Sequence, residues 1–515
     1  MNVIYIGLTN SFAFNEVNHL RKNFSLIPKH IIHTIDKNEL IKFEKIGTTT
    51  QLLSDSTILK NNNLIFDKEF KINNGLLKFI ESYRHIIEPM FKKFEYSSNA
   101  FSKKEIDDYI YECVAYWFNF IKNKRINLIF HLESPHRIFD FIIYLIAKYL
   151  KIPNLWFRDP NLDGKYLIEW DYFKSPSNLR ETYIKKIKQK IRHKKNINNK
   201  LNKKYVNFIK KEQIFFNPNK ITIRNKPNFK GKIGFFKFYF DYLFSYKHPI
   251  TNSEFKQIKI KNRNFNCKII GFNYLFWSFT NILKTLIIKI YYKLISHKGI
   301  IKKNFCIFYM SYQPEATSYP DAWDMHDQSK NIDLLIKNIP KDYQLAIKEH
   351  PTQLNLTSSF FYKNPQIRQI KFYRKISDKY KDRVIFLDEK FDLNTSKNTP
   401  KFTATINGTI GLESVIKGIP AIIFGHAWYQ GCEGTFCIRN IKDLKKLFIS
   451  NKFKTVNKKK VNFFIGLAHN LALPFYYKDI QKRYYPQYKN LTKKQKLTNL
   501  KKLFNLGLRS MSKKN

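Results

Sequence analysis

The 515-residue chain has few cysteines, few glycines and none of the short signatures of common metal or nucleotide-hydrolysing enzymes. No C-x₂-C pair occurs, and the number of cysteines is odd, which favours a reducing compartment; the five are Cys113, Cys267, Cys306, Cys432 and Cys437. Asp-x-Asp, P-loop, H-E-x-x-H and complete G-x-G-x-x-G motifs are also missing. These absences argue against an enzyme that holds a pyrophosphate donor through a metal ion. They also argue against an ATPase, a zinc protease and a standard dinucleotide enzyme. We therefore expect no metal and no cofactor.

Long apolar runs are absent as well. No uninterrupted run reaches the roughly 18 residues needed to span a bilayer. The nearest approach, residues 272–295, is broken by Lys284, Lys289 and Lys293, which indicates an amphipathic helix. Residues 2–7 resemble a first β-strand and not a signal peptide. We expect a cytoplasmic protein, with peripheral attachment to the inner face of the cytoplasmic membrane as an option.

Positive charge is abundant: Lys and Arg number 92 against 40 Asp and Glu, a net charge of +52. Such an excess predicts attraction to nucleic acid, anionic membranes or acidic substrates. Asn, Ile, Lys, Phe and Tyr are frequent throughout, however, and an AT-rich genome produces the same bias without selection for an anionic partner. Both interpretations stay open.

The length predicts at least two domains. Residues 128–132, 137–150 and 155–157 read as strand, helix and strand, and the helix is apolar nearly all round. Farther on, strands and helices alternate, which predicts parallel β-α-β units; we place strands at 306–310, 344–348, 384–387, 402–406 and 421–424, and helices at 328–338, 372–380 and 410–417. The predicted fold is α/β, with two Rossmann-like domains at 1–174 and 301–455. A helical, lysine-rich insertion spans 175–300, and a basic helical tail, 456–515, packs back on the first domain.

Two segments of the second domain could bind a phosphate. His350 follows a strand and precedes Pro351, so its imidazole lies at a sheet edge, where it could donate to a phosphate oxygen; Lys348 shares that face if the strand persists. Asn407, Gly408 and Thr409 follow another strand and open a helix, whose first amides bind anions. Glu413, in the first turn, could accept from ribose hydroxyls. The structural alternatives are a loop-packing histidine and a carboxylate that favours the helix dipole.

Other polar residues lie at strand ends. Gln313 and Glu315, in the loop after the strand at 306–310, are candidate ligand contacts. In the first domain, Glu133 and Asp159 each follow a strand. Glycosyl transfer needs a carboxylate near the reacting carbon, as a base or as a nucleophile, and these two are the candidates. With His350 they form the predicted catalytic set.

Several of these residues belong to motifs that resemble those of a known protein family. The second-half motifs Lys348-Glu349-His350-Pro351, Gly408-Thr409-Ile410-Gly411-Leu412-Glu413 and Gly418-Ile419-Pro420, with Pro135-His136 in the first half, resemble the capsule polysaccharide biosynthesis family and related Kdo and sialic acid transferases. The resemblance implies a GT-B fold and a metal-independent glycosyltransferase. Its donor would be a nucleotide sugar, a CMP-activated acidic sugar such as Kdo, with His350 and Pro351 on the CMP phosphate. Its acceptor would be a glycan or a lipid-linked oligosaccharide. The family's acidic motif corresponds here to Arg158-Asp159-Pro160, which departs from the usual pair of acidic residues before glycine.

Two other functions remain as alternatives. The lysine-rich stretch 184–211, interleaved with aromatic residues, could bind nucleic acid, although it shows no recognisable module, so we expect nucleic acid not to be the partner. A transferase fold that has lost activity could act as a scaffold for other polysaccharide enzymes.

Overall fold

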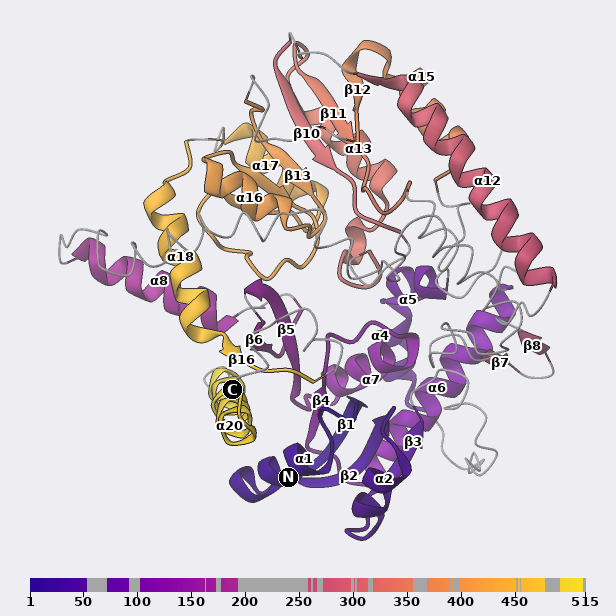
Figure 1. The fold of residues 1–515 in the computed structure, drawn as a ribbon, viewed down its shortest axis with the longest axis vertical. Coiled ribbons are helices and arrows are strands. Elements are labelled where there is room, and N and C mark those ends of the chain that lie inside the picture. Colours follow the sequence, from indigo (N-terminus) through magenta and orange to yellow (C-terminus); the bar gives the residue numbers. More distant parts are fainter. Residues whose placement is uncertain are drawn as a thin grey trace.

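The computed structural model contains two α/β domains, each built on a seven-stranded sheet. Figure 1 shows the first domain below and the second above, with helices on the faces of both sheets. The residues that the structure describes are 1–52, 72–91, 102–162, 164–172, 177–192, 258–260, 263–265, 272–297, 301, 303–313, 318–354, 368–389, 391, 399–450, 453, 455–477 and 491–512.

The first sheet has the strand order β16-β6-β5-β4-β1-β2-β3. Its strands are β1 (Asn2–Leu8), β2 (Ile27–His33), β3 (Thr49–Leu52), β4 (Leu128–His131), β5 (Asn154–Leu162), β6 (Lys165–Glu169) and β16 (Leu473–Pro474). The first five are parallel, whereas β6 and β16 are antiparallel to their neighbours. Its helices are α1 (Phe14–Phe24), α2 (Lys37–Glu44), α4 (Asn74–Glu81), α5 (Arg84–Met90), α6 (Lys103–Asn123) and α7 (Ile138–Tyr149). The β1 sequence is almost wholly apolar because helices cover both faces of the sheet.

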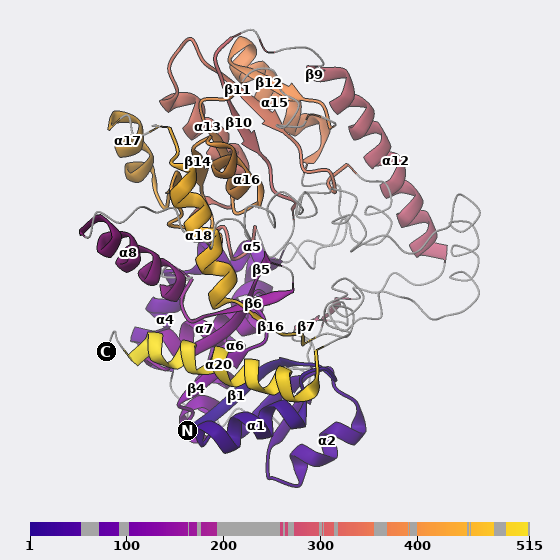
Figure 2. The same cartoon turned by 60° about the vertical axis from the view of Figure 1, so that its left-hand side comes forward.

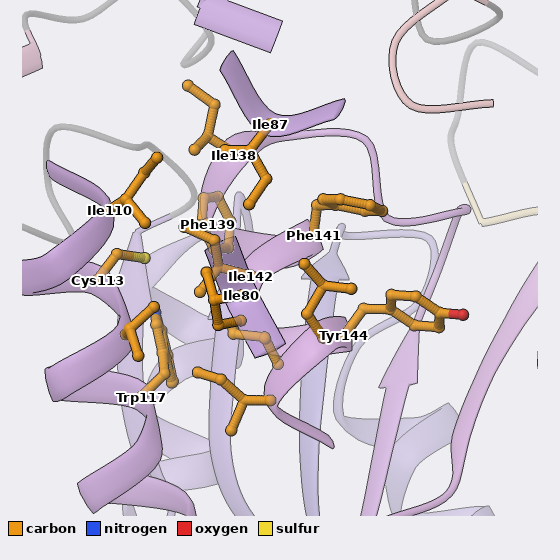
Figure 3. Packing of buried hydrophobic residues seen from close by; sticks show 14 of the residues in the cluster. Ile80, Ile87, Ile110, Cys113, Trp117, Ile138, Phe139, Phe141, Ile142 and Tyr144 are labelled. Atoms are coloured by element: carbon orange, nitrogen blue, oxygen red, sulfur yellow. The ribbon is translucent and has the colours of Figure 1, made fainter. Parts of the chain in front are cut away.

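Helix α7 is the buried centre of this domain. Every residue from 138 to 147 is buried, as the all-round apolar sequence predicts. The neighbouring α6 begins with a capping box, in which Ser102 and Glu105 each bind the other's backbone amide. Figure 3 shows Cys113 and Trp117 of α6 on the side that faces the apolar residues of α7. This packing fixes the helix that follows β4.

The second sheet has the order β15-β14-β13-β10-β11-β12-β9, and all of its strand pairs are parallel. Its strands are β9 (Ser296–His297), β10 (Phe305–Tyr309), β11 (Gln344–Lys348), β12 (Val384–Leu387), β13 (Thr403–Thr405), β14 (Ala421–Ile423) and β15 (Thr435–Cys437). Its helices are α12 (Phe272–Ile295), α13 (Gln328–Asn338), α15 (Ile370–Tyr380), α16 (Ile410–Lys417), α17 (Ile441–Ile449) and α18 (Lys458–Leu471). From β10 the chain moves outward through β11 to β12 and then returns to β13 on the other side. The strand order therefore reverses between β10 and β13, where open α/β sheets bind their ligands.

The elements predicted for the second domain are confirmed, with α13, β11, β12 and α16 at the predicted residues. The first domain differs more. The prediction that a strand ends before Asp159 is wrong, because β5 continues to Leu162 and forms a hairpin with β6. The structure also contains α1, β2, α2, β3, α4 and α5 in a region to which the sequence assigned no elements.

The described part of the predicted insertion contains more than helices. Besides α8 (Ser177–Arg192) and α12, it has a small antiparallel sheet of β7 (Ile258–Ile260) and β8 (Arg263–Phe265). Strand β9, which pairs with β12, precedes residue 301, where we placed the start of the second domain. The lysine-rich and aromatic stretch 193–257 lies outside the described residues. Among those described, no helix has the length and apolarity needed to cross a membrane.

The carboxyl-terminal tail connects the two domains. Helix α18 packs on α16 of the second domain, and β16 then joins the edge of the first sheet. The last helix, α20 (Lys493–Ser512), packs on α1 and β6 of the first domain. Figure 2 shows α20 lying along the outside of that domain. Lys496 of α20 is buried and donates to Glu16 at 2.7 Å, so a buried ion pair secures the tail.

Candidate active site at the carboxyl edge of the second sheet

The two predicted phosphate-binding segments lie at the same edge of the second sheet. Tyr309 of β10 is level with Lys348 of β11 on one side and with Thr405 of β13 on the other. The chain leaves the sheet beyond these positions, toward His350 in one loop and Gly408 in the other. Neighbouring strands lie about 4.8 Å apart, so a single intervening strand, β10, separates the two loops. They flank the point at which the strand order reverses.

His350 is held as a neutral hydrogen-bond donor. The Thr352 amide donates to its Nδ1 at 3.2 Å, so a neutral ring carries its proton on Nε2. Burial, aided by Arg368 and Lys348, lowers the pKa of His350 to about 4, which keeps the ring neutral at pH 7. Tyr312 lies against the ring, with centroids 5.8 Å apart. The Nε2–H group is therefore suited to bind an acceptor such as a phosphate oxygen.

A buried ion pair supports the His350 loop from beneath. The side chains of Glu349 and Arg368 form a salt bridge, and each keeps only 1% of its surface exposed. The Tyr373 hydroxyl donates to the other Glu349 oxygen at 2.7 Å, and the His350 amide donates to Glu349 Oε1 at 2.6 Å. The Glu349 amide donates to the Tyr292 hydroxyl, which in turn donates to the Leu387 carbonyl of β12. Residue 349 is thus anchored to three elements, and His350 follows it directly.

The loop after β10 is tied to the same network. The amide of Gln328 both accepts from Ser311 N and donates to Ser311 O, at 2.8 and 2.9 Å. Arg368 donates to the Ser311 carbonyl and to Gln313 Oε1. Gln313 is buried, and its amide nitrogen donates to the His326 carbonyl at 3.1 Å. The structure therefore gives Gln313 internal partners on both ends of its amide. Glu315 lies outside the described residues.

The Gly408 turn lies at the start of α16. Thr409 is the residue before the helix, and its side chain makes no capping hydrogen bond. The first amides of a helix have no carbonyl partner within it, although the Gly411 amide donates to the Gly408 carbonyl at 3.2 Å. The amides of Gly408 and Thr409, just before the helix, can meet an anion. Asn407 Oδ1 is buried and lacks a hydrogen-bond partner in the described chain. Glu413 is half-buried in the first turn. This end of the helix offers both donors and an acceptor to a ligand.

Close packing fixes the position of α16. A Cβ added to Gly411 would lie 2.5 Å from the Tyr429 hydroxyl and 2.6 Å from Ile423 Cδ1. The Tyr429 hydroxyl also donates to the Gly408 carbonyl. The helix ends at Gly418, whose φ of +94° is left-handed, as expected of a helix-ending glycine. Gly411 thus allows α16 to approach β14 closely.

Lys348 and Pro351 lie on either side of the His350 loop without forming part of its network. The Lys348 ammonium donates to the Phe391 carbonyl, beyond β12, at 2.6 Å. The strand ends at Lys348, so the alternation that would place its side chain beside that of His350 does not continue. Pro351 is exposed.

The two candidate carboxylates of the first domain are both half-buried. Glu133 follows β4 and lies 3.6 Å from Arg137, which also pairs with the buried Asp140 at 3.4 Å. Asp159 lies within the β5–β6 hairpin and accepts from the Tyr166 hydroxyl at 3.5 Å. Both residues lie beyond the level at which β4 ends, because His131 pairs with Trp156 of β5.

The carboxyl edges of the two sheets face each other through residues that the sequence analysis did not single out. Arg158 donates to Glu169 at 2.9 Å in its own domain and to Asp321 at 3.1 Å in the other. Burial alone would lower the pKa of Arg158, but the two carboxylates raise it above its usual value. The Asp321 carbonyl accepts from the amide of His426, just after β14. Partners 163 residues apart leave no local signal by which the sequence could reveal them.

Aromatic rings surround this contact. The His426 ring packs on Tyr172 of the first domain and on Trp323 of the second, with centroids 5.7 and 5.9 Å apart. Burial, together with Arg439 and Arg158, lowers the pKa of His426 well below its usual value. Trp323 also contacts Phe141 of α7 and Tyr83. An apolar contact thus joins the domains beside the Arg158 bridge.

Two Rossmann-like domains whose carboxyl edges face each other define the GT-B class of fold. Residues 326–435 match the family model described as capsule polysaccharide biosynthesis protein. The matched segment includes His350, Gly408, Thr409 and Glu413, so the similarity to this family covers the candidate phosphate-binding loops. No curated protein matches the chain.

Solved structures align with low scores. The UDP-GlcNAc 2-epimerase of Methanocaldococcus jannaschii, in complex with UDP-GlcNAc and UDP, aligns at 11% identity over 91% of this chain and 100% of that chain, with a TM-score of 0.23. Two KpsC structures of Thermosulfurimonas dismutans also align. The beta Kdo 2,4 transferase aligns at 14% identity over 39% of this chain and 65% of that chain, with a TM-score of 0.20. The beta Kdo 2,7 transferase aligns at 11% identity over 36% of this chain and 61% of that chain, with a TM-score of 0.18.

Proposed function

We propose that the protein is a glycosyltransferase of capsular or other surface polysaccharide biosynthesis. Its donor is a nucleotide sugar, of which a CMP-activated acidic sugar such as Kdo is the class we favour, and its acceptor is a glycan or glycolipid. The family match supports the pathway. The observation that carries the donor site is the neutral His350, with its proton on Nε2, at the same sheet edge as the first turn of α16.

The proposed chemistry follows from charge. When the sugar leaves, the phosphate of the nucleoside monophosphate gains negative charge, and fixed donors that meet this charge lower the barrier. His350 Nε2–H and the amides of Gly408 and Thr409 are such donors. Asn407 Oδ1 and Glu413 could accept from the nucleoside. This proposal needs no metal, and it assigns Lys348 a contribution through the positive charge of its ammonium, which donates to the Phe391 carbonyl.

The acceptor belongs to the first domain in this proposal. Glu133 or Asp159 would accept the proton of the acceptor hydroxyl, or attack the sugar if configuration is retained. Arg137 forms an ion pair with Glu133, and the Tyr166 hydroxyl donates to Asp159. We place the enzyme in the cytoplasm, where activated sugars are made.

A thermal-shift screen tests the donor class. CMP-, UDP- and GDP-sugars are each added to the purified protein, and a ligand that binds only the folded state at about 100 times its Kd stabilises it by about 2.7 kcal/mol. We expect the CMP-sugar to raise Tm most and to be consumed when an acceptor is supplied. Stabilisation by UDP- or GDP-sugars alone would refute the CMP assignment. Binding without turnover would favour a scaffold, and no binding at all would contradict the proposed function.

A further inference from the structure

Helix α12 exposes an apolar stripe on its outer face. Its inner face is buried in the second domain through Thr285, Ile288 and Tyr292. Its outer residues recur at helical spacing and are all exposed; they are Leu283, Leu286, Ile287, Ile290 and Leu294. Ile287 retains 55% of its surface and Leu294 78%. In the described part of the chain, five of the twelve exposed large hydrophobic residues lie on these three turns. Such clustering marks an interaction surface.

The residues around this stripe are mostly basic. On α12 itself, Lys284 and Lys293 are exposed, and Lys289 pairs with Glu389 at 3.3 Å. Helix α15 packs beside α12, with the rings of Tyr292 and Tyr373 5.3 Å apart. Its exposed residues are Lys371, Arg374, Lys375, Asp378 and Lys379. The surface formed by the stripe and these residues, the α12–α15 face, therefore combines apolar side chains with an excess of positive charge.

The two helices present this face in one direction. Ile288 and Tyr292 of α12 and Tyr373 and Ile376 of α15 join the same buried core against the second sheet. Their opposite sides consequently point away from the sheet together. Figures 1 and 2 both show α12 on the outside of the molecule, with α15 at its carboxyl-terminal end. A flat partner could contact both helices at once.

We propose that the α12–α15 face docks on an anionic lipid bilayer. Helix α12 lies in the headgroup plane, its apolar stripe enters the upper acyl region, and the lysines meet anionic headgroups. The lysine stems are apolar and let the ammonium groups remain in water. A second copy of the chain is a poorer occupant, because a symmetric pair would bring the same cations against one another. The inference does not depend on the reaction proposed above.

Vesicle flotation of the full-length protein tests this docking. One set of vesicles is phosphatidylcholine alone, and the other has about one phosphatidylglycerol for every three phosphatidylcholines, enough to attract basic segments. The apolar variant is Ile287→Ser with Ile290→Ser, and the charge variant is Lys284→Glu with Lys293→Glu. The matched control places the same serines at the exposed Ile441 and Ile449 of α17, where Ile449 keeps 85% of its surface. Thermal melting by circular dichroism checks that each variant folds.

We expect the wild type and the α17 control to float with the anionic vesicles, and each α12 variant to lose about tenfold or more in vesicle affinity. The proposal is overturned if the wild type stays unbound, if neutral vesicles bind it equally well, or if folded α12 variants bind as the wild type does. Size-exclusion chromatography covers the alternative occupant. A wild-type dimer that the two α12 serines dissociate, without vesicle binding, would make the face a subunit interface and would also overturn the proposal.

Discussion

The carboxyl edges of the two sheets hold their polar side chains in different ways. At the second edge the charged support is buried: Glu349 and Arg368 pair beneath the loop, and His350, whose Nδ1 accepts from the Thr352 amide, carries its proton on Nε2. At the first edge Arg137 pairs with Glu133 in the loop itself. At the second edge, the ion pair that stabilises the loop is therefore formed by residues other than His350, which would contact the ligand. At the first edge, the candidate catalytic carboxylate Glu133 is itself part of the ion pair. A variant of a supporting residue should consequently affect folding at the second edge, while the role of the first-edge carboxylates must be read from activity.

The largest effect should come from breaking the buried pair. Arg368→Met leaves the Glu349 carboxylate buried without its cation, which costs about 3–5 kcal/mol of unfolding free energy. Urea denaturation measures it. The control is Lys42→Met, which breaks the surface pair with Glu39 at 2.5 Å and should cost no more than about 1 kcal/mol. Similar losses in both variants would mean that the Glu349 network does not support the second edge.

The close packing of α16 on β14 gives a second test of how the second edge is held. Gly411→Ala forces a methyl group against Tyr429 and Ile423, and overpacking of this kind costs about 1–3 kcal/mol. Ile423→Val removes the Cδ1 atom that the new methyl group meets, so the double variant should be less destabilised than the sum of the two single variants. Additive losses in urea denaturation would show that the close approach does not limit this position.

The bridge between the edges can be measured by a double-mutant cycle. Arg158→Met and Asp321→Asn remove the two ends of the interdomain contact, and we expect a coupling energy of about 1 kcal/mol. A parallel cycle with Glu169→Gln reports the contact inside the first domain. Zero coupling with Asp321, beside clear coupling with Glu169, would mean that Arg158 serves only its own domain.

The most gradual effect concerns pH, because it is spread over the whole interval between the unfolded and folded pKa values of His350. His350 has a pKa of about 4 when folded and near 6.5 when unfolded, so between these values the unfolded chain binds a proton that the folded chain does not. Stability should therefore fall as pH falls through this window, by at most about 1.4 kcal/mol per pH unit for this group. His33, at the first edge, has a similar folded pKa of about 4. His350→Gln should reduce the slope, and the exposed His297→Gln should leave it unchanged. An equal slope in all three proteins would contradict the neutral state of the half-buried His350.

The sequence predicted the second domain well because its parallel strands are buried on both faces. Such strands read as short apolar runs, and Gly418 and Pro420 mark the boundary between α16 and β14. It predicted the first domain less well, since residues 8–107 mix polar and apolar positions without a clear period. The extension of β5 past Asp159 was missed because Asp159-Pro160 resembles a strand end, yet the hairpin with β6 carries the strand to Leu162.

Part of the candidate site could likewise be predicted from the sequence, and part could not. The positions of His350 and Gly408 follow from local order, strand then turn then helix, which the sequence contains. The internal role of Gln313, the Arg368 partner of Glu349 and the Arg158 bridge depend on contacts between distant segments. A single sequence carries no local signal for such pairs, and the structure supplies them.

Calorimetric titration of CMP into wild-type protein and His350→Ala tests the central claim most directly, because free CMP presents the phosphate without the sugar. His297→Ala is the control, since that histidine is exposed on β9, the edge strand that lies two places from β11. A hydrogen bond to a charged group contributes about 1.5–3 kcal/mol, so we predict that His350→Ala stays folded and binds CMP at least about tenfold more weakly. Unchanged CMP affinity in folded His350→Ala would contradict the account.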